Sequence, residues 1–152
     1  MEENNNIEKN VLQKIQSELK APKSQRNNFG NYNYRSAEDI LEAVKPILAK
    51  YHVCIISNDE IVEIADRVYI KTTVMLAHGE RPFASATAFA REPLSKKGMD
   101  ESQITGATAS YAKKYALNGL LAIDDSKDAD FTNKHEKKSP ATKVANNNND
   151  LI

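Results

Sequence analysis

The stretch Arg67–Arg91, RVYIKTTVMLAHGERPFASATAFAR, decides the fold of this 152-residue chain. Its first part, 67–77, alternates in polarity, and one face of the alternation carries Val68, Ile70, Thr72, Val74 and Leu76. A period of two predicts a half-buried strand. After the turn His78-Gly79-Glu80, a second strand over 82–91 places only alanines on one face, Ala84, Ala86, Ala88 and Ala90. Such a face lets a helix approach closely, and two strands joined by a short turn predict an antiparallel meander.

Further strands are predicted upstream, where short apolar runs alternate with turn residues. Val53–Ser57 and Glu60–Ala65 are the candidate strands, and Asn58-Asp59 is the candidate turn between them. A second turn candidate, Asp66-Arg67, leads into the central strand. The sheet is therefore predicted to contain about three to four strands.

Three helices are predicted around this sheet. Ile7–Lys20 carries an apolar residue at every fourth position, which is typical of an amphipathic helix. Ser36 begins a second helix, in which Asp39 completes a capping box, and Pro46 is expected to kink this helix or end its regular part. The third helix is predicted from about Ser102 to Leu120. Ala21–Arg35 has no periodicity and is predicted to be a loop.

These elements predict an α+β fold in which helices pack on an antiparallel β-meander. One domain is expected over residues 1–125, which suits the length of the chain. Residues 126–152 are rich in Lys, Ser, Thr and Asn and carry few apolar residues. Because so little apolar surface cannot offset the entropy of ordering, we expect a disordered polar tail.

The composition of the chain restricts its compartment and its partners. The 21 basic and 21 acidic residues balance, so no global field attracts nucleic acid, although Lys and Arg outnumber Asp and Glu within 81–118. The single cysteine, Cys54, lies in an apolar run and is expected to be a buried structural thiol in a reducing compartment. No apolar stretch is long enough to span a membrane, and a cytoplasmic location is expected, in the host cell if a phage encodes the chain.

The predicted third helix contains the segment Gln103–Leu117, QITGATASYAKKYAL. At about 100° per residue its residues divide between two sides. The side expected to pack on the sheet consists of Ile104, Thr108, Tyr111 and Tyr115. The other side is small and polar and ends in cations: Gln103, Gly106, Ala107, Ser110, Lys113 and Lys114. Small residues, hydrogen-bonding groups and cations suit a phosphodiester backbone, but an ordinary solvated helix face has the same pattern, so spacing alone leaves both interpretations open.

An ordered set of short motifs surrounds this segment. Tyr32-Asn33-Tyr34-Arg35 precedes the second helix, Lys45-Pro46-Ile47-Leu48 lies within it, and a Gln103-x-x-Gly106 stretch precedes Ser110–Leu117, SYAKKYAL. Aspartates follow. Over roughly residues 8–130 this set resembles the Erf (essential recombination function) family of phage single-strand annealing proteins. Lys113-Lys114 departs from the family pattern, in which we expect an arginine; phosphate binding survives that change, but bidentate geometry does not.

The resemblance implies a protein that binds single-stranded DNA without sequence preference and anneals complementary strands without ATP. It implies no catalytic residues, no cofactor and no metal, and it implies a homo-oligomeric ring or filament. A distant likeness to eukaryotic annealing recombinases implies a curved antiparallel sheet backed by a helix, with DNA in a groove that crosses subunits. A single-strand-binding protein or an exonuclease is a candidate protein partner, and no membrane contact is expected.

Backbone binding needs cations and hydrogen-bonding groups, and it weakens with salt. The candidate DNA contacts are Gln103, Ser110, Lys113 and Lys114 on the helix, Arg91, Lys96 and Lys97 before it, and Lys23, Arg26 and Arg35 in the first loop. That loop interleaves its cations with Phe29, Tyr32 and Tyr34, on which bases are able to stack. Burial of the two tyrosines under the second helix, or contact between subunits, fits the loop as well. Lys96 and Lys97 also fit a solvated loop.

Two other function classes fit parts of the sequence. The acidic cluster of Asp124, Asp125, Asp128 and Asp130 suits Mg²⁺ in a nuclease, or an acidic exit that repels DNA or contacts a neighbour. An oligomeric scaffold that binds no DNA is the third class. The histidines lack zinc-ligand spacing, and the absence of a Walker-type loop disfavours ATP-driven strand exchange. Annealing without covalent chemistry is the preferred hypothesis, so the chain is not expected to be an enzyme.

Overall fold

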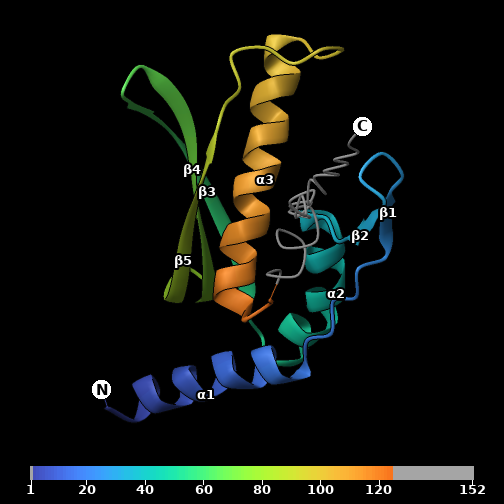
Figure 1. Cartoon of the computed structure of the whole chain (residues 1–152). Coiled ribbons are helices and arrows are strands. Elements are labelled where there is room, and N and C mark those ends of the chain that lie inside the picture. Colours follow the sequence, from blue (N-terminus) through green and yellow to red (C-terminus); the bar gives the residue numbers. More distant parts are fainter. Residues whose placement is uncertain (1, 125–152) are drawn as a thin grey trace, which may run out of the picture.

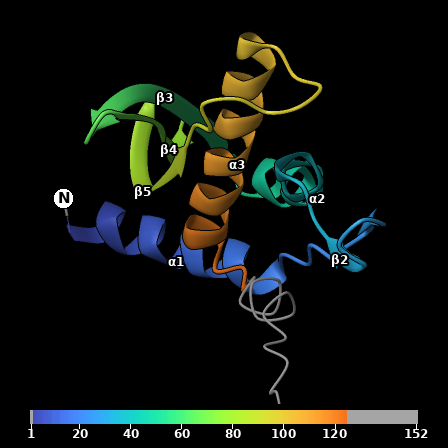
Figure 2. The same cartoon turned by 45° about the horizontal axis from the view of Figure 1, so that its top comes forward.

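A three-stranded sheet backed by a long helix forms the centre of the computed structural model, which describes residues 2–124 (Figure 1). The elements follow in the order α1 (Glu2–Glu18), β1 (Gln25–Asn27), β2 (Tyr32–Tyr34), α2 (Ala37–Lys50), β3 (Cys54–Ile64), β4 (Arg67–His78), β5 (Arg81–Arg91) and α3 (Glu101–Leu121). In both cartoon views α3 lies between the sheet and α2, and α1 runs across one end (Figures 1 and 2). The predicted α+β architecture, an antiparallel meander packed by helices, is confirmed. The predicted tail over 126–152 lies outside the described residues.

The sheet has the order β3-β4-β5, and both pairings are antiparallel. β3 runs without interruption through Asn58-Asp59, so the turn predicted there was wrong. The reason is cross-strand pairing: Asp59 lies opposite Thr72, and the buried Thr72 hydroxyl donates to the Asp59 carboxylate at 2.5 Å. The turn falls at Ala65 and Asp66, which both adopt positive φ, as a tight hairpin between twisted strands requires.

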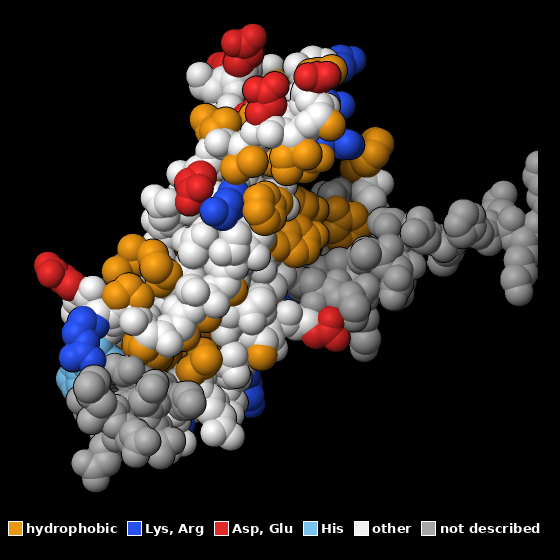
Figure 3. All heavy atoms as spheres, turned by 90° about the vertical axis from the view of Figure 1, so that its left-hand side faces the viewer, with side chains coloured by type: hydrophobic (Ala, Val, Ile, Leu, Met, Phe, Trp, Pro, Cys, Tyr) orange, Lys and Arg blue, Asp and Glu red, His pale blue; other side chains and the backbone are white. Residues whose placement is uncertain are grey.

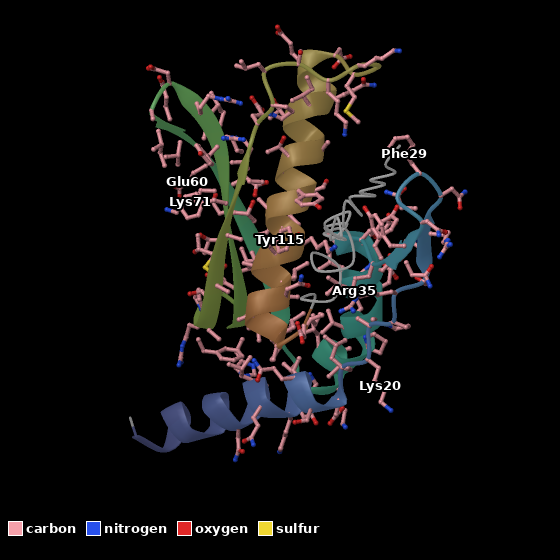
Figure 4. All side chains as sticks on the ribbon, viewed as in Figure 1. Lys20, Phe29, Arg35, Glu60, Lys71 and Tyr115 are labelled. Atoms are coloured by element: carbon pink, nitrogen blue, oxygen red, sulfur yellow. The ribbon has the colours of Figure 1, made fainter. Side chains whose placement is uncertain are left out.

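The two faces of the sheet have different environments, as the alternation in β4 predicts. The face toward the helices is buried at Ile70, Thr72, Val74 and Leu76. On the other face Lys71 forms an ion pair with Glu60 at 3.3 Å, and both side chains point away from α3 (Figure 4). Cys54 is exposed at the start of the edge strand β3, so the expectation of a buried thiol was wrong. A residue in an apolar run at a sheet edge is buried only where another helix or strand packs over its face of the sheet.

α3 packs against the alanine side chains of β5. Ala84, Ala86 and Ala88 contact the main core, and a Cβ added at Gly119 would lie 3.7 Å from the Cβ of Ala86. The helix begins after a capping box between Asp100 and Gln103 and ends at Leu121, and its C-cap residue Ala122 has a left-handed backbone conformation. In its C-terminal half, the side chains of Leu117, Leu120 and Leu121 are buried in one core with residues of α1, α2 and β4. Side chains as small as alanine on the strand allow this close approach.

α1 and α2 are tied to each other and to α3 by polar contacts at their ends. Lys50 donates to Glu18 at 2.9 Å, and the Tyr51 hydroxyl also donates to Glu18. The Tyr51 hydrogen bond, followed by that of Lys50, lowers the pKa of the Glu18 carboxyl below its usual value. The amide of Gln16 donates to the carbonyl of Leu120 at 2.8 Å. The C-terminus of α1 is thus fixed against both neighbouring helices.

The predicted capping box of α2 is confirmed. The Asp39 amide donates to the Ser36 hydroxyl at 3.1 Å, and the Ser36 amide donates to the Asp39 carboxylate at 2.8 Å. Pro46 lies inside α2, which continues four residues further to Lys50. Of the two effects expected of Pro46, an end to the regular part does not occur, because burial of Val44 and Leu48 on either side holds the helix together. The kink stays a prediction.

The segment predicted as a loop, Ala21–Arg35, contains the hairpin β1–β2. Asn27 organises its tip: the side-chain carbonyl accepts from the amides of Phe29 and Gly30, both at 3.0 Å. The ring of Tyr32 lies over Gly30, where a Cβ would approach it to 2.4 Å. Strands of three residues give no readable period, which is why the sequence pattern did not indicate them.

Pro46→Ala is expected to stabilise the chain. Pro46 is exposed, so alanine leaves no cavity, and the new N–H can donate to the carbonyl of Glu42. The free energy of unfolding should rise by about 1 to 3 kcal/mol in chemical denaturation. A lower stability would mean that the proline itself is needed for packing of α2.

Asp39→Asn tests the cap through pH. Mainly because of the hydrogen bond from the Ser36 amide, the pKa of Asp39 lies below its ordinary value of 3.8. A depressed pKa stabilises the fold above the ordinary value, and this contribution disappears as pH falls through the folded pKa. The stability difference between the native chain and Asp39→Asn should therefore be present at pH 7 and shrink below about pH 4. A difference independent of pH would contradict the carboxylate cap.

Candidate nucleic-acid interface

A pocket of about 410 Å³ opens where the end of β5, the following segment and the exposed side of α3 meet. Its lining consists of Phe89, Ala90, Arg91, Pro93, Lys96, Met99, Ile104, Ala107, Thr108, Tyr111 and Tyr115. We call it the β5–α3 pocket. Figure 3 shows hydrophobic side chains gathered over the upper half of the side that it faces, with both basic and acidic side chains around them. The pocket lining combines four aromatic or sulfur-containing side chains with two cations and contains no carboxylate.

Two of the aromatic residues, Tyr111 and Tyr115, were expected to pack on the sheet, and this expectation was wrong. Tyr111 is 57% exposed and Tyr115 is 43% exposed. The side of α3 that is buried on the sheet follows a spacing of four: Ile104, Thr108, Ala112 and Ala116. Each step of four residues advances about 40° around the helix, so by Ala112 and Ala116 the buried side has turned away from the side on which Ile104 lies. Tyr111 and Tyr115 stay on the Ile104 side and therefore reach the rim of the pocket.

Lys114 is buried, although the sequence placed it on the polar side of the helix that was expected to face outward. It is only 8% exposed, and its ammonium lies 5.9 Å from the ring centroid of Tyr111 and 5.7 Å from that of Tyr115. A buried ammonium loses hydration, and the electron-rich ring faces compensate part of that loss. The two rings lie 5.3 Å apart at 55° to each other. Lys114 is thus part of the support for the two tyrosines, and its direct contact with DNA stays a prediction.

The basic residues before α3 lie beside this aromatic surface. Arg91 and Lys96 line the pocket, and Lys97 is exposed next to Lys96. Glu92, which follows Arg91 in the sequence, accepts a hydrogen bond from the Thr105 hydroxyl and does not line the pocket. The lining itself therefore carries two positive charges and no negative one, although the net charge of the chain is zero.

The remaining candidate contacts on α3 have different surroundings. Lys113 is half-buried, and Ser110 is exposed. The Gln103 side chain closes the capping box, where its carbonyl oxygen accepts from the Asp100 amide at 3.0 Å. Capping gives Gln103 a structural role that the sequence pattern did not indicate. Contact of these three residues with DNA remains a prediction.

The candidate contacts in the hairpin segment lie beyond α2, away from the sheet (Figures 2 and 4). Arg26 donates to the side chains of Asn31 and Asn33, and Arg35 is only 8% exposed. Lys23 is exposed. Tyr32 and Tyr34 are half-buried, in an edge-to-face pair at 6.2 Å, whereas Phe29 at the tip is fully exposed. The structure does not bring Lys23, Arg26 and Arg35 together with the β5–α3 pocket.

Three of the four residues in the acidic cluster, Asp125, Asp128 and Asp130, lie outside the described residues. Asp124 is exposed just after α3. Within residues 2–124, no group of three or more His, Cys, Asp or Glu side chains has a metal-binding arrangement. Among those residues, no helix is long and apolar enough to cross a membrane.

Comparison with known proteins adds a family to this geometry. The model of the ERF superfamily matches residues 9–150. The chain is similar to the essential recombination function protein of Salmonella phage P22, with 55% identity over 130 residues, which are 86% of this chain and 62% of that protein. The chain thus spans less than two thirds of that relative's length. No solved structure matches it.

Alanine substitution should distinguish the two adjacent lysines of α3. Lys114→Ala removes a buried side chain beneath two rings and should lower the free energy of unfolding by about 2 kcal/mol. Lys113→Ala, at a half-buried position, should change it by less than about 0.5 kcal/mol. Equal losses in chemical denaturation would contradict the supporting role of Lys114.

Proposed function

The chain belongs to the ERF superfamily, and from this premise we propose that it is a recombination protein that binds single-stranded DNA without sequence preference and promotes annealing of complementary strands without ATP. The observation that carries the proposal is the β5–α3 pocket, in which Arg91 and Lys96 share one lining with the exposed Tyr111 and Tyr115. Cations beside aromatic rings are the combination that single-stranded nucleic acid requires.

Each group in this surface has a role in the proposed complex. Arg91, Lys96, Lys97 and Lys113 attract and neutralise phosphates, and the tyrosine rings offer faces to the bases. Every base has a stacking face and every nucleotide a phosphate, so such contacts carry no sequence preference. Annealing breaks no covalent bond, so positioning by these contacts is sufficient and the proposed protein is not an enzyme.

We propose that the protein assembles into a ring or filament of identical subunits. β3 and β5 are the end strands of the three-stranded sheet, so each has a backbone edge that its own sheet does not pair. Such edges are available for pairing with another chain. An array of subunits would place many pockets along one DNA strand. The proposed setting is the cytoplasm of the host cell, with a single-strand-binding protein or an exonuclease as a further partner.

Annealing without ATP is the direct test. The purified chain should accelerate pairing of complementary oligonucleotides in EDTA without nucleotide. No acceleration would contradict the proposal, and degradation of single strands that needs Mg²⁺ and disappears in Asp124→Asn would favour a nuclease.

Removal of the two pocket cations should change the salt dependence of binding. For Arg91→Gln with Lys96→Gln, the slope of log affinity against log salt should fall by about 1.4, because each phosphate contact on a single strand contributes about 0.7. Lys20→Gln with Lys45→Gln is the matched control, since it removes two exposed lysines, one shortly after α1 and one on α2. The control should leave the slope unchanged. Equal effects of the two pairs would mean that binding does not use the pocket, and an intact oligomer without DNA binding would favour a scaffold.

A further inference from the structure

We propose that the β5–α3 pocket takes up one unpaired nucleobase per subunit, and that this makes the protein bind single strands more tightly than the duplex that annealing produces. The inference rests on the proposed function and adds the recognised group and its consequence. It follows from the shape of the pocket, because a surface that contacts only phosphates needs no apolar recess between its cations.

The tyrosine pair offers stacking surface. Rings 5.3 Å apart and inclined at 55° are not stacked flat on one another, and about half of each side chain is exposed. Lys114 does not line the pocket, and its ammonium, 5.9 and 5.7 Å from the two ring centroids, supports the rings from within the protein. The ring surfaces that face the pocket are therefore held in place before any ligand arrives, which lowers the entropy cost of binding.

The rest of the lining provides room and adaptability. Ala90 and Ala107 are small, and Met99 is a flexible side chain that is able to adjust to rings of different size. A volume of about 410 Å³ lies within the range of pockets that hold small molecules. One base with its sugar is a ligand of that class, whereas a run of stacked bases is not.

Charge favours a nucleotide over an apolar protein segment as the occupant. Arg91 and Lys96 belong to the lining itself, and the lining contains no carboxylate. A base inserted against Tyr111 carries a phosphate on each side, and the two cations are placed to neutralise them. An apolar segment of a second copy would bury these cations without a partner, at a cost in desolvation.

Discrimination between single strand and duplex follows from this geometry. A base in a duplex must be unpaired and unstacked before it can enter a pocket, whereas an unpaired base has much less to lose. Phosphates are present in both forms, so the cations contribute to both. When a complementary strand captures the base, the subunit loses its stacking contact and retains only the salt-sensitive ones. Annealing would then lower the affinity of the protein for its product.

The test compares dissociation constants for a single-stranded oligonucleotide and for its duplex. In Tyr111→Ala with Tyr115→Ala, binding of the single strand should weaken about tenfold or more, because base stacking on an aromatic ring is lost. Binding of the duplex should change by less than about twofold, because the phosphate contacts remain. Tyr111→Phe with Tyr115→Phe keeps both rings and should behave as the native chain. Arg91→Gln with Lys96→Gln should weaken both forms in parallel.

An oligonucleotide of abasic sites tests the base itself. The native chain should bind this backbone about tenfold or more weakly than the normal single strand, and the double alanine variant should bind the two alike. Circular dichroism and thermal unfolding would establish that each variant is folded. Parallel loss of single-strand and duplex binding, or no loss, in the folded alanine variant would overturn the inference while leaving the proposed function intact. A smaller oligomer with unchanged DNA binding would overturn it in favour of contact with a second copy. Failure of the native chain to bind either form would overturn the proposed function and the inference with it.

Discussion

Close packing of α3 on the alanine side chains of β5 is the contact on which the rest of the structure depends. Alanines on the strand let the helix approach closely, and the series Ile104, Thr108, Ala112 and Ala116 among the buried residues of the helix follows a spacing of four. That spacing turns the buried side around the helix axis as the helix proceeds. Tyr111 and Tyr115 are left at the open side, and a recess forms between them and the end of β5. The same packing that forms the core thus creates the candidate site.

Local rules predicted much of the fold. The alternation in β4, the capping box at Ser36 and the alanine face of β5 each follow from short-range sequence patterns, and each is confirmed. The failures occurred where a distant partner decides. Asn58-Asp59 is typical of a turn, but pairing with β4 keeps it in a strand. Pro46 is typical of a helix end, but core packing on both sides carries α2 past it.

In the candidate site, too, the predictions failed where contacts with distant residues decide which side chains are buried. The motif over Ser110–Leu117 lies in the helix that forms one wall of the β5–α3 pocket, and Arg91 and Lys96 lie in the pocket lining. The exposures of the tyrosines and Lys114 were nevertheless predicted in reverse. A helical wheel treats the buried stripe as straight, and it cannot show how the helix crosses a sheet of three strands. The path of α3 across β5 had to be known before the side chains could be assigned to core or surface.

A photochemical crosslink tests most directly whether single-stranded DNA occupies the β5–α3 pocket. An oligonucleotide with 5-iododeoxyuridine at each thymine position would be irradiated in complex with the native chain, and the crosslinked residue would be identified by mass spectrometry. The account predicts crosslinks at Tyr111 or Tyr115, because their rings are the surfaces on which a base would stack. Crosslinks confined to Phe29, Tyr32 or Tyr34 in the hairpin segment, with none on α3, would contradict it.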